Sequence, residues 1–186
     1  MNAKTMSWVL LTVALSACSG IQVSSDYDPD ADFTNLRTYA WLPESPAQPM
    51  QTHPQAPFVK QRVVAAVDRE LAARGYSNIV DGQPDFYVGY HLAVEQKMTT
   101  QMMDTSYGYP TGPGWYYRPA PHTSRSYTYE YEEGTLAVDV AAGQNKVLIW
   151  RGTAQAELRK KFDADKSEQR INEAVKRILA QFPPKK

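Results

Sequence analysis

Cysteine is nearly absent from this chain of 186 residues, which contains one, and that scarcity excludes several classes of protein. A single thiol allows no disulfide framework and no cysteine-ligated metal cluster. The three histidines, His53, His91 and His122, stand too far apart for a zinc-binding pair on a helix. There is also no Gly-x-Ser-x-Gly elbow, no glycine-rich phosphate loop and no dinucleotide fingerprint. We therefore expect a protein that is not an enzyme and that needs neither a metal nor a cofactor.

An excess of charge of either sign is missing as well, because 20 Lys and Arg balance 20 Asp and Glu. Without a basic run or a basic helix face, the composition argues against nucleic acid and against anionic lipid as dedicated partners. The apolar run at the N-terminus, Ser7 to Leu15, is also far shorter than the roughly 20 apolar residues that a membrane-spanning helix needs.

The N-terminus does carry a targeting signal. Met1 to Lys4 holds one positive charge, the apolar run follows, and Leu15 to Cys18 (LSAC) resembles the bacterial lipobox. In lipoproteins with this motif the thiol receives a diacylglyceryl group, the chain is cut before the cysteine, and the new amino terminus is acylated. We expect a lipoprotein signal peptide at 1–17 and a lipidated Cys18 with a short tether at 18–20. The alternative is a cleaved secretory signal with a chance cysteine.

The expected location is the outer membrane, with the domain facing the periplasm. Ser19 rather than Asp follows the cysteine, which in the enterobacterial sorting rule permits export to the outer membrane. Two or more acyl chains give stable attachment. Only a few residues separate Cys18 from the first strand-like segment, and fully extended they reach about 15 Å. The domain is therefore expected close to the membrane that Cys18 enters.

Residues 21–184 predict a single domain of strands and two helices. The strands are identified by alternation and by β-branched or aromatic content, and are expected at 21–23, 37–42, 76–80, 86–94, 134–140 and 146–157. The helices are expected at Pro57–Arg74, ended by Gly75, and at Ser167–Phe182, capped by Ser167 or Asp165. Short turns between consecutive strands predict an α+β two-layer sandwich, an antiparallel sheet with two helices packed on one face.

The stretch 98–128 has a different composition, rich in Tyr, Gly and Pro, and is expected to be an irregular insert at the tip of a hairpin. Its aromatic residues include Trp115, Tyr116 and Tyr117, which are candidate binding residues because such side chains stack on sugar rings or pack on proteins. A low-complexity loop without a binding role is the alternative. Peptidoglycan or an envelope protein would be the partner.

Asp139 and Arg151 interrupt two apolar strands and are the other candidate binding residues. A three-residue loop 143–145 with Asn145 in the left-handed conformation would pair Val140 with Leu148 and set Asp139 diagonal to Arg151, on the face opposite the apolar residues. The two could form a polar patch for a ligand or a cross-strand salt bridge, of which we prefer the salt bridge.

Other carboxylates have simpler interpretations. Asp26, Asp28, Asp30 and Asp32 alternate but lack the Gly and Glu of a calcium loop, so we expect turn and capping chemistry. The remaining candidates for an envelope-acting hydrolase, should the chain be one, are Asp85, His91 and Asp139.

Several blocks of the sequence resemble the bacterial domain-of-unknown-function 4136 family. In chain order they are Asp26–Pro29, Asp32–Phe33, Thr38–Trp41, Pro84–Phe86, Val88–His91, Glu133–Asp139, Leu148–Ala154 and Phe182–Pro184. The resemblance implies an envelope lipoprotein and supplies no activity, since the family has none established. The function expected is a non-catalytic binding or interaction module, or else an accessory subunit of an envelope assembly.

Overall fold

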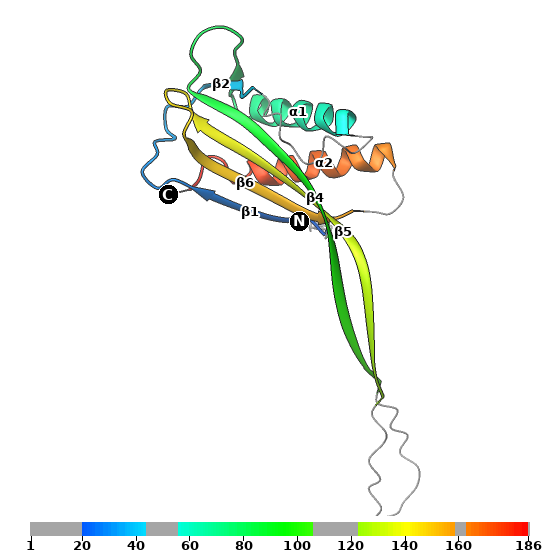
Figure 1. The fold of residues 1–186 in the computed structure, drawn as a ribbon. Coiled ribbons are helices and arrows are strands. Elements are labelled where there is room, and N and C mark those ends of the chain that lie inside the picture. The colour runs from blue at the N-terminus through cyan, green and yellow to red at the C-terminus, as the bar shows by residue number, and fades with distance from the viewer. Residues whose placement is uncertain (1–19, 44–55, 106–122, 159–162, 186) are drawn as a thin grey trace, which may run out of the picture.

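The computed structural model describes residues 20–43, 56–105, 123–158 and 163–185. These form six strands and two helices in the order expected from the sequence (Figure 1). Their bounds are β1 Gln22–Tyr27, β2 Thr38–Trp41, α1 Ala56–Ala73, β3 Ser77–Asn78, β4 Phe86–Thr105, β5 Thr123–Ala142, β6 Leu148–Glu157 and α2 Ala164–Leu179. The strands form one sheet in the order β1-β6-β5-β4-β2-β3.

The α+β class is confirmed, with α1 and α2 side by side on one face of the sheet (Figure 1). The expectation of a purely antiparallel sheet is wrong, because β2 pairs in parallel with both β4 and β3. The physical reason is α1, which follows β2 and returns the chain for the next strand to run in the same direction as β2. The antiparallel pairs are β4 with β5, β5 with β6, and β6 with β1.

The core lies between the helices and the sheet face that they cover. Trp150, Phe86 and Phe182 pack together there, with centroids of Trp150 and Phe182 5.1 Å apart. Ile178 of α2 is fully buried, and Gly152 of β6 lies beneath it. A Cβ on Gly152 would come within 2.6 Å of the Ile178 Cγ2 atom, so glycine at this position allows the helix to approach the sheet.

The ends of the helices depend on local chemistry. Gly75, at φ +86°, ends α1 as predicted. The cap of α2 is not Ser167 or Asp165 but Asp163, whose side chain accepts from the Lys166 N–H at 3.2 Å. Hydrogen bonds also attach α1 to the sheet. The Asp68 carboxylate of α1 accepts from the Tyr39 hydroxyl and from the Trp41 indole N–H, both of β2.

The turn between β5 and β6 differs from the predicted one. Lys146, not Asn145, has the left-handed conformation, at φ 58°, and a β-bulge follows. Val140 therefore pairs with Trp150 instead of Leu148, a shift of two residues. Since side chains alternate with a period of two, the shift keeps Asp139 and Arg151 together on the outer face. The bulge overturns two other predicted faces, because Leu148 lies opposite Ala141 and is exposed, while Ile149 is buried in the core cluster.

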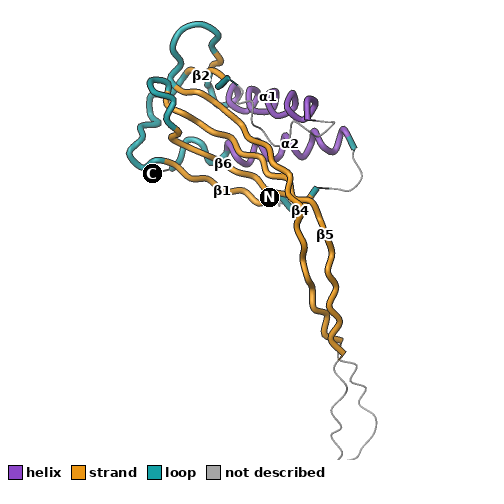
Figure 2. Tube along the Cα trace, viewed as in Figure 1, coloured by secondary structure: helices purple, strands orange, loops and turns teal. Residues whose placement is uncertain are grey.

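β4 and β5 are each 20 residues long and continue well past the helices as a two-stranded ribbon (Figure 2). The predicted irregular insert at 98–128 is therefore too wide, because regular pairing runs to the pair Thr105–Thr123. All Gly and Pro residues of that stretch lie between Gly108 and Pro121, which explains where the strands end.

Candidate interaction surfaces

The outer face of the sheet, opposite α1 and α2, carries a row of polar residues across three strands. Asp26 of β1, Arg151 of β6 and Asp139 of β5 are direct neighbours in the register, and Gly89 of β4 follows. Asp139 is only 6% exposed, and among the described residues it is the one charged side chain that is buried. Leu42 packs over Gly89 beside it, which contributes to this burial.

Asp139 has two polar neighbours on this face, Arg151 and His91. Arg151 donates from Nε to Oδ1 at 2.6 Å and from Nη2 to Oδ2 at 2.7 Å. His91 Nε2 lies 3.1 Å from Oδ2. The hydrogen bonds that Arg151 donates to Asp139 raise the pKa of Arg151 above its usual value, against the opposing effect of burial. This is the cross-strand salt bridge that the sequence favoured, although the two residues are opposite each other and not diagonal.

This geometry makes Asp139 a poor general base, because the guanidinium engages both of its oxygens. Asp85, the third hydrolase candidate, lies just before the start of β4, six residues along the chain from His91. Its Oδ2 accepts from the backbone N–H groups of Arg37 and Thr38 and from the Thr38 hydroxyl, at 2.8–2.9 Å. These hydrogen bonds lower the pKa of Asp85. The structure therefore brings together His91 and Asp139, but not Asp85.

Of the alternating aspartates, Asp28 and Asp32 have the turn chemistry that the sequence predicts, whereas Asp26 lies within β1 and none of them caps a described helix. Asp26 accepts from the Tyr27 N–H, Asp28 from the Asp30 N–H, and Asp32 from Thr34. Within the described ranges, no group of three or more His, Cys, Asp or Glu side chains is arranged to hold a metal ion.

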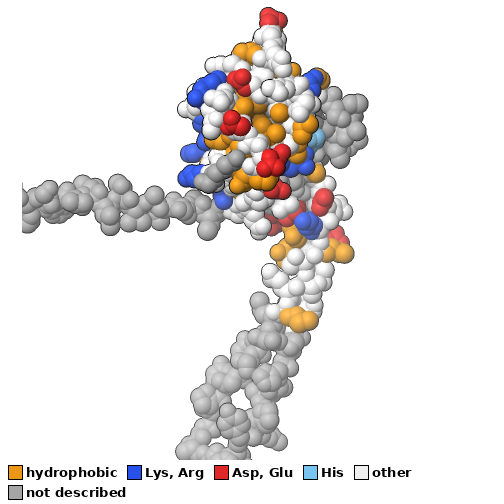
Figure 3. All heavy atoms as spheres, turned by 90° about the vertical axis from the view of Figure 1, so that its left-hand side faces the viewer, with side chains coloured by type: hydrophobic (Ala, Val, Ile, Leu, Met, Phe, Trp, Pro, Cys, Tyr) orange, Lys and Arg blue, Asp and Glu red, His pale blue; other side chains and the backbone are white. Residues whose placement is uncertain are grey.

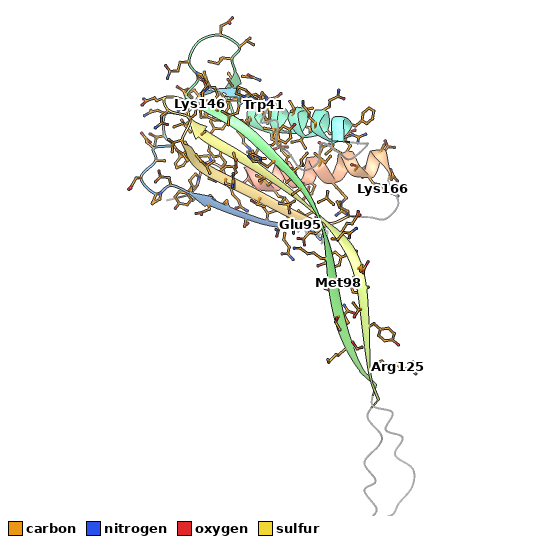
Figure 4. The ribbon with its side chains drawn as sticks, viewed as in Figure 1. Trp41, Glu95, Met98, Arg125, Lys146 and Lys166 are labelled. Atoms are coloured by element: carbon orange, nitrogen blue, oxygen red, sulfur yellow. The ribbon has the colours of Figure 1, made fainter. Side chains whose placement is uncertain are left out.

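The second candidate surface is the projecting part of β4 and β5, which we call the arm and define as residues 96–105 and 123–132. It begins beyond the pair Glu133–Glu157, the last one between β5 and β6. In the described part of the chain, register pairing along the arm is between β4 and β5 alone. Figure 4 labels Glu95 at the base of the arm, Met98 along it and Arg125 near its described end.

Side chains alternate between the two sides of the arm. The methionine side holds Gln96, Met98, Thr100, Met102, Ser126, Thr128, Glu130 and Glu132. The tyrosine side holds Lys97, Thr99, Gln101, Arg125, Tyr127, Tyr129 and Tyr131. The rings of Tyr129 and Tyr131 are 5.8 Å apart on that side, and Lys97 pairs with Glu133 at the base.

Several large apolar side chains of the arm are exposed to solvent and are not part of the core. Met98 is 73% exposed and Met102 80%, while Tyr127 and Tyr129 are 52% and 44% exposed. The space-filling view shows hydrophobic side chains along the arm, away from the body of the domain (Figure 3). Clusters of this kind mark interaction sites.

Sequence reasoning missed the arm strands, although a signal was present. Tyr127, Tyr129 and Tyr131 recur at every second position, with a Thr between the first two, as in a strand. The expected binding residues Trp115, Tyr116 and Tyr117 lie outside the described residues, as does Cys18 with its lipobox. No described helix is long and apolar enough to cross a membrane.

Comparison with known proteins gives a family match and a distant likeness of fold. A family model described as a domain of unknown function (DUF4136) matches residues 23–184. No curated protein matches the chain. A PDZ domain protein from Parabacteroides distasonis is similar, with a TM-score of 0.55 and 11% identity over 89% of this chain and 37% of that one. This chain thus spans just over a third of that protein, and at this identity the likeness shows the fold alone.

A PelC dodecamer from Paraburkholderia phytofirmans is similar with a TM-score of 0.47 and 10% identity, over 89% of this chain and 99% of that one. A likeness this weak supports no argument about the present chain.

Proposed function

The chain belongs to the DUF4136 family, and from this premise we propose that it is a lipid-anchored, non-catalytic binding module of the bacterial envelope. Cys18 would hold the domain on the periplasmic side of the outer membrane, and the arm would bind an envelope component. An accessory role in an envelope assembly is one form of the same function.

The observation that carries the proposal is the arm itself. A two-stranded ribbon is marginally stable by itself in water, and the arm adds exposed Met and Tyr side chains on both of its sides. Packing of the domain does not need the arm, because the buried residues of the core cluster end at Tyr90 in β4 and begin at Leu136 in β5. An element that contributes nothing to the core and exposes apolar side chains fits a binding role.

The polar row on the outer face supports the non-catalytic part of the proposal. Asp139 is occupied by Arg151, and Asp85 is occupied by Thr38 and Arg37, so both carboxylates have structural partners. A carboxylate oxygen that already accepts such hydrogen bonds is less available to accept a proton from a substrate.

The anchoring part is tested by labelling cells with radioactive palmitate. The wild-type protein should incorporate the label, because the Cys18 thiol and the new amino terminus are acylated. Cys18→Ser should incorporate none and should stay uncleaved or be soluble. Ser16→Ala, which keeps a small residue in the lipobox, is the matched control and should be labelled like wild type. Equal labelling of wild type and Cys18→Ser would contradict the proposed anchor.

A further inference from the structure

The start of β1 and the base of the arm lie at the same end of the sheet. Gln22 pairs with Gln155, and Gln155 pairs with Thr135, so the three residues form one row across β1, β6 and β5. β1 and β5 run in the same direction, because both are antiparallel to β6. The chain before Gln22 therefore leaves the sheet on the side from which the arm projects (Figure 1).

The arm is longer than the tether that would join the domain to the membrane. The four residue steps from Gln22 back to Cys18 span at most about 15 Å. Measured along β5 from Thr135, which lies in the row of Gln22, the same number of residues ends at Tyr131. The described arm continues from Tyr131 to Thr123, a further eight residues or about 26 Å. The arm therefore extends farther from the row of Gln22 than the tether to Cys18 can reach, so the arm reaches the membrane surface that holds Cys18.

The reverse orientation, with the turn between β5 and β6 towards the membrane, requires more chain than the tether has. From Thr135 to Ala142 the sheet extends seven residues, about 23 Å, beyond the row of Gln22. Insertion of the arm into the hydrocarbon is also unfavourable, since the open edges of a two-stranded ribbon leave backbone groups without partners there. The remaining arrangement has the arm lying along the membrane surface.

The two sides of the arm differ in aromatic content and in charge, and both differences favour the tyrosine side as the one that faces the lipid. Among its described side chains, the methionine side has Glu130 and Glu132 and no cation, whereas the tyrosine side has Arg125, as well as Lys97, which pairs with Glu133 at the base. Lipid phosphates repel carboxylates and attract cations, and tyrosine rings favour the interface between hydrocarbon and water.

We propose that the tyrosine side of the arm, centred on Tyr127 and Tyr129, lies on the phospholipid surface to which Cys18 attaches the chain. This inference rests on the anchoring proposed above and names the membrane itself as the component that the tyrosine side contacts. The contact depends mainly on aromatic side chains, so it does not require anionic lipid.

The test uses the full lipidated protein in vesicles of phosphatidylcholine and phosphatidylethanolamine. Since Cys18 is the only cysteine and lipidation blocks it, an introduced cysteine is the one thiol available for a fluorescent nitrobenzoxadiazole label. Thr99→Cys and Thr100→Cys form a matched pair, because these adjacent threonines lie on opposite sides of the arm. Val80→Cys, 98% exposed in the loop before β4, is the distant reference.

We expect dithionite, which acts from water, to reduce the label at position 99 several-fold more slowly than the labels at positions 100 and 80. Lipids carrying a nitroxide should quench only the label at position 99. Adding Tyr127→Ser and Tyr129→Ser to the Thr99→Cys protein should remove this protection, while circular dichroism confirms that the domain stays folded.

Equal reduction rates at positions 99 and 80 would overturn the membrane contact. If position 99 is then found crosslinked to a protein or to peptidoglycan in cells, the arm still binds an envelope component and only the lipid contact is wrong. If it is accessible in vesicles and uncrosslinked in cells, both proposals fail.

Discussion

At the scale of single residues, the pair Asp139–Arg151 determines the chemistry of the outer face. The carboxylate is buried, while the Arg151 and His91 side chains are about half exposed. Burial of a carboxylate is tolerated when donors surround it, and two donors come from one guanidinium. We therefore assign this pair a role in stability.

Arg151→Ala should destabilise the domain by about 1–3 kcal/mol, because Asp139 would be left buried with His91 as its remaining donor. Urea denaturation measures the effect. Gln155→Ala, an exposed change on the same strand and face, is the control and should have little effect. Adding Asp139→Asn to Arg151→Ala should restore part of the loss, since no charge would then be buried. Equal stability of Arg151→Ala and Gln155→Ala would show that the pair contributes nothing.

Asp85 should make the free energy of unfolding depend on pH. Its folded-state pKa is lowered from 3.8 by hydrogen bonds from Thr38 and Arg37. A lowered pKa stabilises the fold above the unfolded value, and this contribution is lost as the pH falls through the folded value. Asp85→Asn should therefore be less stable than wild type at pH 7, and the gap should narrow at pH 3. Asp81→Asn, in the same exposed loop, is the matched variant for comparison, and a gap for Asp85→Asn that is independent of pH would contradict the assignment.

At the scale of elements, local sequence patterns predict the helices and most strands, whereas they do not predict how strands that are distant in the chain pair with each other. The periodic apolar residues of α2 were sufficient to predict the helix, because one face of it packs on the sheet. Asp163, Asp165 and Ser167 are all good caps within five residues, so the sequence could not choose among them. The parallel pairing of β2 with β4 spans α1, and no local pattern determines it.

The arm was missed for a related reason. A ribbon that is exposed on both sides does not bury one face, so its alternation is weaker than in a core strand and is limited here to Tyr127, Tyr129 and Tyr131. The salt bridge of the candidate site was predicted, because alternation places Asp139 and Arg151 on one face. Its register was not, since that depends on the conformation of Lys146 in the turn.

Shortening the arm should have little effect on stability, whereas a charged substitution on the buried face of α2 should unfold the domain. Replacing Thr100 to Ser124 with a short Gly-rich linker should leave the melting temperature within a few degrees of wild type, because shortening a loop changes closure entropy by only about 0.6 kcal/mol per halving. Ile178→Asp should unfold the domain, because it buries an unpaired charge. The exposed change Lys176→Asp on the same helix is the control. A large loss of stability on shortening the arm would make the arm part of the core.

At the scale of the whole molecule, the fold separates two tasks between two parts of one sheet. The part that α1 and α2 cover holds the core, and the part that projects as the arm carries exposed apolar side chains. The chain leads towards Cys18 from the same end of the sheet. Anchor and arm would therefore act on the same side of the domain, at the membrane surface.

Site-specific photocrosslinking in intact cells tests most directly whether the arm is the binding element. A benzophenone amino acid would replace Tyr129 on the tyrosine side, Met98 on the methionine side, or Val80 as a reference outside the arm that is more exposed than either. The account predicts discrete lipid, protein or glycan adducts from positions 129 or 98 and none from position 80. Adducts from position 80 alone, or from none of the three, would contradict a binding role for the arm.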